Sequence, residues 1–120
     1  MNLINLAFRF VLELIGLGTI GAWGWHQGEG WPRILLAVGL PLAAGAIWGT
    51  FNVRDDPSRS GTAPVPVPGI VRLLIELGFF GFAVWALFDM GLDTWAWSLG
   101  LAILVHYAAS HRRVGWLLSR

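Results

Sequence analysis

Cysteine is absent from this chain of 120 residues. Disulfide bonds, iron–sulfur clusters and thiolate metal sites are therefore excluded. Charged residues are also scarce, at 12% of the chain, and a net charge of +1 gives no basic surface of the kind that binds nucleic acid. The sequence contains no nucleophile–base constellation, phosphate loop or metal-ligand spacing. We therefore expect no enzyme, no cofactor or metal site and no nucleic-acid partner.

What the chain has in abundance is apolar residues. They make up 56% of the sequence, and the mean hydropathy is +0.64, well outside the balance of ordinary soluble proteins. A helix needs about 20 residues to cross a hydrocarbon core of about 30 Å. Four stretches approach that length: Leu3–Trp25, Arg33–Phe51, Gly69–Phe88 and Thr94–Ser110. These stretches predict an all-α integral membrane protein, a single domain over residues 1–120, with the lipid bilayer as its main partner.

The breaks between the stretches divide the chain into two hairpins. Glycine and polar residues at 26–30 and 90–93 favour short turns, and Pro32 suits the first turn of a second helix. Between the hairpins lies one linker, residues 52–68, in which the alternating prolines of Pro64–Pro68 favour an extended strand. We expect one repeat over about residues 3–51 and a second over about 69–112.

Arginine placement predicts the orientation in the membrane. With four crossings, the N-terminus, the linker and the C-terminus share one side. That side carries most of the arginines outside the spans, whereas the opposite loops hold only Arg33; the arginines on the richer side are Arg54, Arg59, Arg112, Arg113 and Arg120. The positive-inside rule then places both termini in the cytoplasm.

A charged signature, Arg-x-x-x-Glu-Leu, occurs once in each repeat. Arg9 and Glu13 begin the first copy, and Arg72 and Glu76 the second. A charge at membrane depth costs roughly 2.5–3.5 kcal/mol. A duplicated charged pair therefore indicates that these side chains are paired with other groups or have a function in the protein. Helical spacing of four residues places each arginine beside its glutamate. We expect two parallel repeats, related by an axis along the membrane normal, to bring both pairs together in the interior of the bundle.

Two interpretations of this intramembrane charged site remain open. In the first, Glu13 and Glu76 exchange protons or ions in a small transporter or channel subunit. In the second, the pairs are buried salt bridges that hold a structural or assembly protein together. Four short helices enclose little space, so transport would favour a homodimer or a partner membrane subunit.

Other residues in the spans predict packing positions and a secondary polar site. Pro41, Gly45 and Gly49 recur every four residues, which favours close helix approach and a kink or notch at the proline. His106 lies within the fourth span, where we expect a hydrogen bond across the bundle; proton transfer with a glutamate is the alternative.

Several motifs of the chain resemble the YrdB-like family of small bacterial four-helix membrane proteins. The residues that carry the resemblance are Arg9-Phe10-Val11-Leu12-Glu13-Leu14, Trp23-Gly24-Trp25, Gly39-Leu40-Pro41-Leu42, Trp48-Gly49-Thr50-Phe51, Arg72-Leu73-Leu74-Ile75-Glu76-Leu77 and Phe80-Gly81. The resemblance covers most of residues 6–90. It implies a four-helix topology and supplies no catalytic residues.

Overall fold

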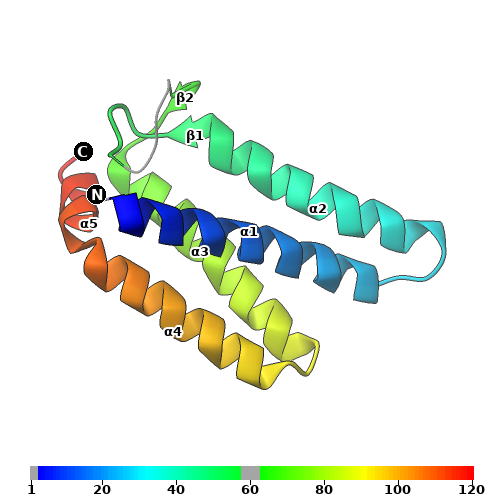
Figure 1. Cartoon of the computed structure of the whole chain (residues 1–120). Helices are drawn as coiled ribbons and strands as arrows, with labels where there is room; N and C mark the ends of the chain where they lie inside the picture. The colour runs from blue at the N-terminus through cyan, green and yellow to red at the C-terminus, as the bar shows by residue number, and fades with distance from the viewer. Residues whose placement is uncertain (1–2, 58–62) are drawn as a thin grey trace.

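The computed structural model describes residues 3–57 and 63–120, and most of this part of the chain is α-helical (Figure 1). Two helical hairpins follow one another, and a short helix ends the described chain. The helices are α1 (Leu3–His26), α2 (Trp31–Thr50), α3 (Gly69–Asp89), α4 (Asp93–Ala109) and α5 (His111–Leu118). The expectation of an all-α protein is confirmed.

Proline and glycine set the helix ends, as the sequence predicts. Pro32 stands in the first turn of α2, and Pro68 precedes α3 with an extended backbone (φ −60°, ψ 151°). The turn before α2 contains Gly30 at φ 63°, and the turn before α4 contains Gly91 at φ 77°. Both angles lie in the left-handed region, where glycine carries no steric penalty.

The connector between the hairpins begins and ends in two very short strands. β1 (Phe51–Asn52) pairs in parallel with β2 (Val65–Pro66). The Val67 amide also donates to the Asn52 carbonyl oxygen at 2.9 Å. The expected extended segment in the proline-rich part of the linker is thus present, while residues 58–62 of the linker lie outside the described residues.

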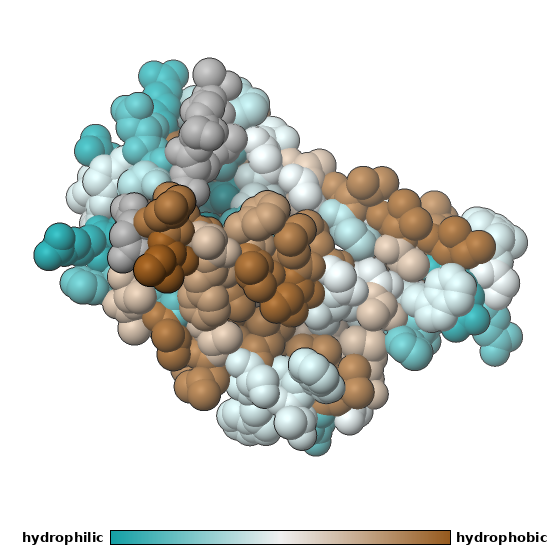
Figure 2. All heavy atoms as spheres, viewed as in Figure 1, coloured by the Kyte–Doolittle hydropathy of each residue, from teal (hydrophilic) through white to brown (hydrophobic). Residues whose placement is uncertain are grey.

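Three helices in the described part of the chain, α1, α2 and α3, are long and apolar enough to cross a membrane. α4 has 17 residues and is about 25 Å long at 1.5 Å per residue. Figure 2 shows apolar side chains over the middle of the molecule and along α2, with hydrophilic residues at the end that carries the connector and α5. A second hydrophilic region covers the opposite tip, where α1 turns into α2.

The core is built from three of the helices. The buried apolar cluster comes from α1, α3 and α4, and its members are Leu12, Ile20, Phe80, Ala83, Leu87, Ala96, Leu99 and Ile103. α2 contributes no buried residue and packs chiefly along α1. The two hairpins are therefore not equivalent in their packing, because the second helix of one is outside the core and the second helix of the other is inside it.

Close helix approach occurs at different glycines from those expected. An added Cβ at Gly45 or Gly49 would meet no atom within 4 Å among the described residues. The expectation that another helix of the same chain packs closely against these two glycines is therefore wrong. The contact between α1 and α2 lies at Gly21 and Gly24 instead. A Cβ at Gly21 would be 3.2 Å from Cγ of Pro41, and one at Gly24 would be 2.7 Å from the Leu36 carbonyl oxygen. Pro41 lies inside α2 and is the one member of the predicted set found at the helix–helix contact.

Candidate functional site: a buried arginine–carboxylate network

Glu76 of α3 is the centre of the site and is fully buried. Its Oε2 accepts hydrogen bonds from Arg72 Nε at 2.9 Å and Arg113 Nη2 at 2.7 Å. Its Oε1 accepts from Arg113 Nη1 at 2.9 Å and from the Tyr107 hydroxyl at 2.8 Å. Arg9 Nη2 adds an ion pair to Oε2 at 3.0 Å, without the alignment of a hydrogen bond. Three guanidinium groups and one phenol therefore surround a single carboxylate.

Arg72 also joins α3 to the end of α2. Its Nη1 donates to the carbonyl oxygens of Trp48 at 2.7 Å and Phe51 at 3.0 Å. The Trp48 carbonyl lies in the last turn of α2, where carbonyl groups have no partner within the helix, so the guanidinium satisfies a group that the helix leaves unpaired. The same guanidinium lies 4.4 Å from the centre of the Trp48 ring, a cation–π contact.

Arg9 connects the first copy of the signature with the second. Its Nε lies 3.2 Å from Oε1 of Glu13, the partner expected from helical spacing, while its Nη2 contacts Glu76. The four charged residues expected from the sequence thus form one cluster. The two glutamates differ in exposure: the side chain of Glu13 is 24% exposed and that of Glu76 is 0% exposed.

Asp56 and Arg113 complete the network from outside the helical hairpins. Arg113 Nε donates to Oδ1 of Asp56 at 2.8 Å and Nη2 donates to Oδ2 at 2.6 Å, a two-pronged contact between side chains that are 1% and 0% exposed. Burial alone would lower the pKa of Arg113, but its hydrogen bonds to Asp56 and Glu76 and their negative charge raise it. Its stabilising contribution is therefore present throughout the pH range in which both carboxylate partners are ionised and the guanidinium is charged.

We refer to these six residues as the charge network; they are Arg9, Glu13, Asp56, Arg72, Glu76 and Arg113. Their three guanidinium groups and three carboxylates balance when all are ionised, as far as the described residues show. A buried charge is tolerated only when it is paired and hydrogen-bonded. The balance therefore allows six charged side chains to occupy one end of an apolar bundle.

His106 makes the hydrogen bonds across the bundle that the sequence predicts. Its Nε2 lies 3.3 Å from Arg9 Nη1 and its Nδ1 lies 3.0 Å from Oδ1 of Asn5. Since arginine only donates, we assign Nε2 as the acceptor and Nδ1–H as a donor, which corresponds to a neutral imidazole. Asn5 in turn donates from Nδ2 to the Ser110 hydroxyl at 2.6 Å. Within the part of the chain that the structure describes, neither ring nitrogen is hydrogen-bonded to a carboxylate.

Three members of the site were not predicted from the sequence: Asp56, Tyr107 and Arg113. In the sequence, Arg113 is only one of several arginines that flank the spans, and Asp56 lies in the linker, where no pattern predicts burial. One signal pointed to Tyr107, because it is the only tyrosine in the chain and follows His106 in an apolar span. A phenol in such a place requires a hydrogen-bond partner.

The network leaves little capacity for a bound metal. Among the residues that the structure describes, no group of three or more histidine and acidic side chains is placed to hold a metal ion. Both oxygens of Glu76 and both oxygens of Asp56 already accept hydrogen bonds from arginine. Donors therefore occupy the carboxylate oxygens that a cation would need.

An apolar pocket of about 380 Å³ lies beside the network, between α1, α2 and α3. Trp48 lines this pocket and also lies under the guanidinium of Arg9, at 5.3 Å from the ring centre. The rest of the pocket wall is aliphatic and aromatic; it includes Ile20, Leu40, Leu74, Phe79 and Phe82.

Fold and site together define a class: a small helical protein with apolar helices of membrane length that enclose a balanced cluster of arginines and carboxylates. The chain belongs to the family described as "Protein of unknown function (DUF2568)", whose model matches residues 7–105. It is 38% identical over 120 residues to the Bacillus subtilis (strain 168) protein named "Uncharacterized protein YrdB", across 100% of this chain and 98% of that protein. The resemblance to a YrdB-like family is confirmed. No solved structure matches the chain.

Proposed function

We propose that the chain is a bacterial inner-membrane protein that crosses the bilayer four times with both termini in the cytoplasm. The arrangement of the chain supports this, since the N-terminus, the connector and the C-terminus lie at one end of the molecule (Figure 1). Arg54, Arg112 and Arg120 are exposed at that end, and Arg33 follows the turn at the other. More arginine on one side is the pattern of a cytoplasmic face.

Within this topology, the function that the geometry supports best is structural: a membrane assembly protein in which the charge network holds the helices, the connector and α5 together. The observation that carries this proposal is the complete pairing of Glu76. Its two oxygens receive four hydrogen bonds and an additional ion pair while the side chain is fully buried. A carboxylate in this state has neither exposure nor free acceptor positions for a substrate.

The two glutamates provide the test of the structural role. Glu76→Gln removes the negative charge that three arginines share, and breaking a buried pair in this way costs about 3–5 kcal/mol of unfolding free energy. Glu13→Gln removes a partly exposed partner of one arginine, so we expect a loss of at most about 1 kcal/mol. Unfolding by SDS in mixed micelles measures both values, with the exposed loop variant Glu29→Gln as the control. Equal, small losses for Glu76→Gln and Glu29→Gln would contradict a structural role for the network.

A second candidate, proton- or ion-linked transport, is favoured by the surroundings of Glu13. This carboxylate has one arginine partner, is 24% exposed, and lies on the same helix as Ile20, which lines the apolar pocket. Because four short helices leave little room for a pathway, such a transporter would work as a homodimer or with a partner membrane subunit.

Flux measurements separate this candidate from the structural one. In proteoliposomes with an imposed pH gradient, a transporter moves protons or cations, and Glu13→Gln abolishes the flux while the unfolding free energy stays near that of the unmodified chain. Glu29→Gln is again the matched control. The absence of any flux above protein-free liposomes would remove the transport candidate and leave the structural one standing.

A further inference from the structure

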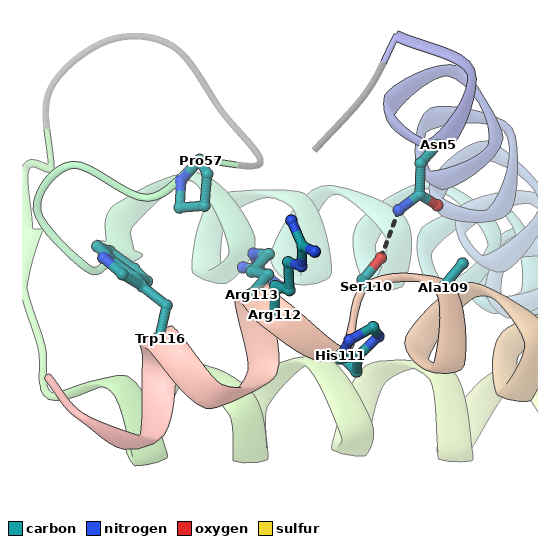
Figure 3. A pocket seen from close by; sticks show the side chains of 8 residues that line it. All are labelled: Asn5, Pro57, Ala109, Ser110, His111, Arg112, Arg113 and Trp116. Atoms are coloured by element: carbon teal, nitrogen blue, oxygen red, sulfur yellow. Dashed lines mark hydrogen bonds between the residues drawn. The ribbon is translucent and has the colours of Figure 1, made fainter.

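A second pocket, of about 580 Å³, opens beside α5 and is not part of the charge network's interior. Figure 3 shows it between the start of α1, the connector and the junction of α4 with α5. Asn5, Pro57 and Ser110 come from these three segments, and Trp116 of α5 stands at one side. We call it the α5 pocket.

The α5 pocket is lined by basic groups and, among the described residues, by no acidic one. Arg112 is exposed and makes no hydrogen bond or ion pair with the residues that the structure describes. Arg113 also contributes to the wall, but its charge is compensated by Asp56 and Glu76. His111 contacts the last turn of α4 through Nδ1, which lies 3.1 Å from the Ala108 carbonyl oxygen. The uncompensated charge of the pocket is therefore positive and resides on Arg112.

The surroundings of the pocket have the character of a membrane surface. α5 follows directly on α4 and carries basic residues at its start and apolar residues at its end. Leu117 is fully buried against the bundle, whereas Leu118 is 60% exposed and Trp116 is half-buried. A short helix with a basic part, an exposed leucine and a tryptophan is typical of the headgroup layer. The pocket thus lies at the depth of lipid phosphates in the topology proposed above.

We propose that the α5 pocket binds the phosphate of an anionic phospholipid headgroup, with Arg112 supplying the charge that recognises it. The proposal rests on the four-span topology, which places this end of the molecule at the cytoplasmic leaflet. Anionic lipids give that leaflet a negative surface potential, to which each nearby arginine adds about 1 kcal/mol of attraction. A pocket of this volume admits a headgroup, and the indole of Trp116 offers an apolar wall for its glycerol carbons.

The experiment measures lipid binding by native mass spectrometry of the full chain in detergent, with phosphatidylglycerol and phosphatidylcholine of the same acyl chains. We expect a clear preference for phosphatidylglycerol. Arg112→Gln should weaken its binding about fivefold, the equivalent of about 1 kcal/mol. Arg54→Gln is the matched control, since it removes the same charge from an exposed position at the same end without lining the pocket. The affinity of the Arg54→Gln variant for phosphatidylglycerol should change less than twofold.

A charge-neutral variant tests the pocket itself. Ala109 lines the pocket at the end of α4 and is exposed, so Ala109→Leu fills part of the volume without altering the network. We expect this variant also to lose the preference for phosphatidylglycerol. Equal effects of Arg112→Gln and Arg54→Gln, with no effect of Ala109→Leu, would overturn the proposal in favour of diffuse surface attraction.

A soluble ligand separates a lipid site from a site for free phosphate esters. Glycerol 1-phosphate carries the same phosphate without acyl chains, and at equal concentration it should bind far more weakly than phosphatidylglycerol. Equal affinity for the two would overturn the assignment to lipid. Neither result bears on the number of membrane crossings, so a failure here is distinguishable from a failure of the proposed topology.

Discussion

At the scale of single residues, the two glutamates of the repeated signature carry the same charge in different surroundings. Glu76 is shared by three arginines and a tyrosine, whereas Glu13 contacts Arg9 and is partly exposed. Arg113 reaches Glu76 from α5 in addition to Arg9 and Arg72, whereas among the described residues only Arg9 forms an ion pair with Glu13. The two copies of the signature therefore differ in structure: the side chain of Glu76 is fully buried, and that of Glu13 is partly exposed.

The pair formed by Asp56 and Arg113 leads to a prediction of energetic coupling. Asp56→Asn leaves a buried guanidinium without one of its two carboxylates, so we expect a loss of about 3 kcal/mol of unfolding free energy. Arg113→Gln should cost a similar amount. Because the two residues are in direct contact, the double variant should lose about 2 kcal/mol less than the sum of the single losses. SDS unfolding of the four proteins gives this coupling energy.

The control for this double-mutant cycle is Arg113→Lys. Lysine keeps the positive charge but cannot make two parallel hydrogen bonds to a carboxylate, so it should recover only part of the lost stability. Strict additivity of Asp56→Asn and Arg113→Gln would show that the contact contributes nothing of its own.

At the scale of elements, α3 and α5 approach each other most closely at a glycine, Gly69. A Cβ at Gly69 would overlap the carbonyl oxygen of Leu117, which is a backbone atom and cannot move without shifting α5. Gly69→Ala should therefore lower the unfolding free energy by about 1–3 kcal/mol. Gly78→Ala in the same helix is the matched control, since a Cβ there meets no described atom within 4 Å and should leave stability unchanged or raise it by up to about 1 kcal/mol. Thermal unfolding in detergent measures both, and equal midpoints would contradict a tight α3–α5 contact.

The helices could be predicted from the sequence to within a few residues. Pro32 and Pro68 mark the starts of α2 and α3, and α4 begins at Asp93 where Thr94 was expected. α5 could not be predicted, because its eight residues follow α4 with only Ser110 between them (φ −104°, ψ 22°), and no proline or glycine marks the break.

The candidate site could be predicted only as far as its local contacts. Arg9 with Glu13 and Arg72 with Glu76 are neighbours by helical spacing alone, and both pairs are found. Arg113 is far from its carboxylate partners in the chain, so its contacts depend on how α5 folds back onto α3. Spacing along the chain carries no information about such a contact.

At the scale of the whole molecule, the absence of cysteine makes the number of membrane crossings directly testable. Single cysteines can be introduced at exposed positions without removing any native thiol: Gln27→Cys in the first turn, Arg54→Cys in the connector and Ser119→Cys after α5. A membrane-impermeant maleimide should label Arg54→Cys and Ser119→Cys from the cytoplasmic side. It should label Gln27→Cys from the opposite side. Three crossings would instead place Ser119→Cys opposite Arg54→Cys, and mass spectrometry of labelled vesicles distinguishes the cases.

Arg113 is the last of the six networked residues to leave the ribosome. Before it emerges, Asp56 and Glu76 lack the arginine that joins them in the folded chain. A chain that ends before Arg113 therefore lacks the ion pairs that link the connector and α3 through α5.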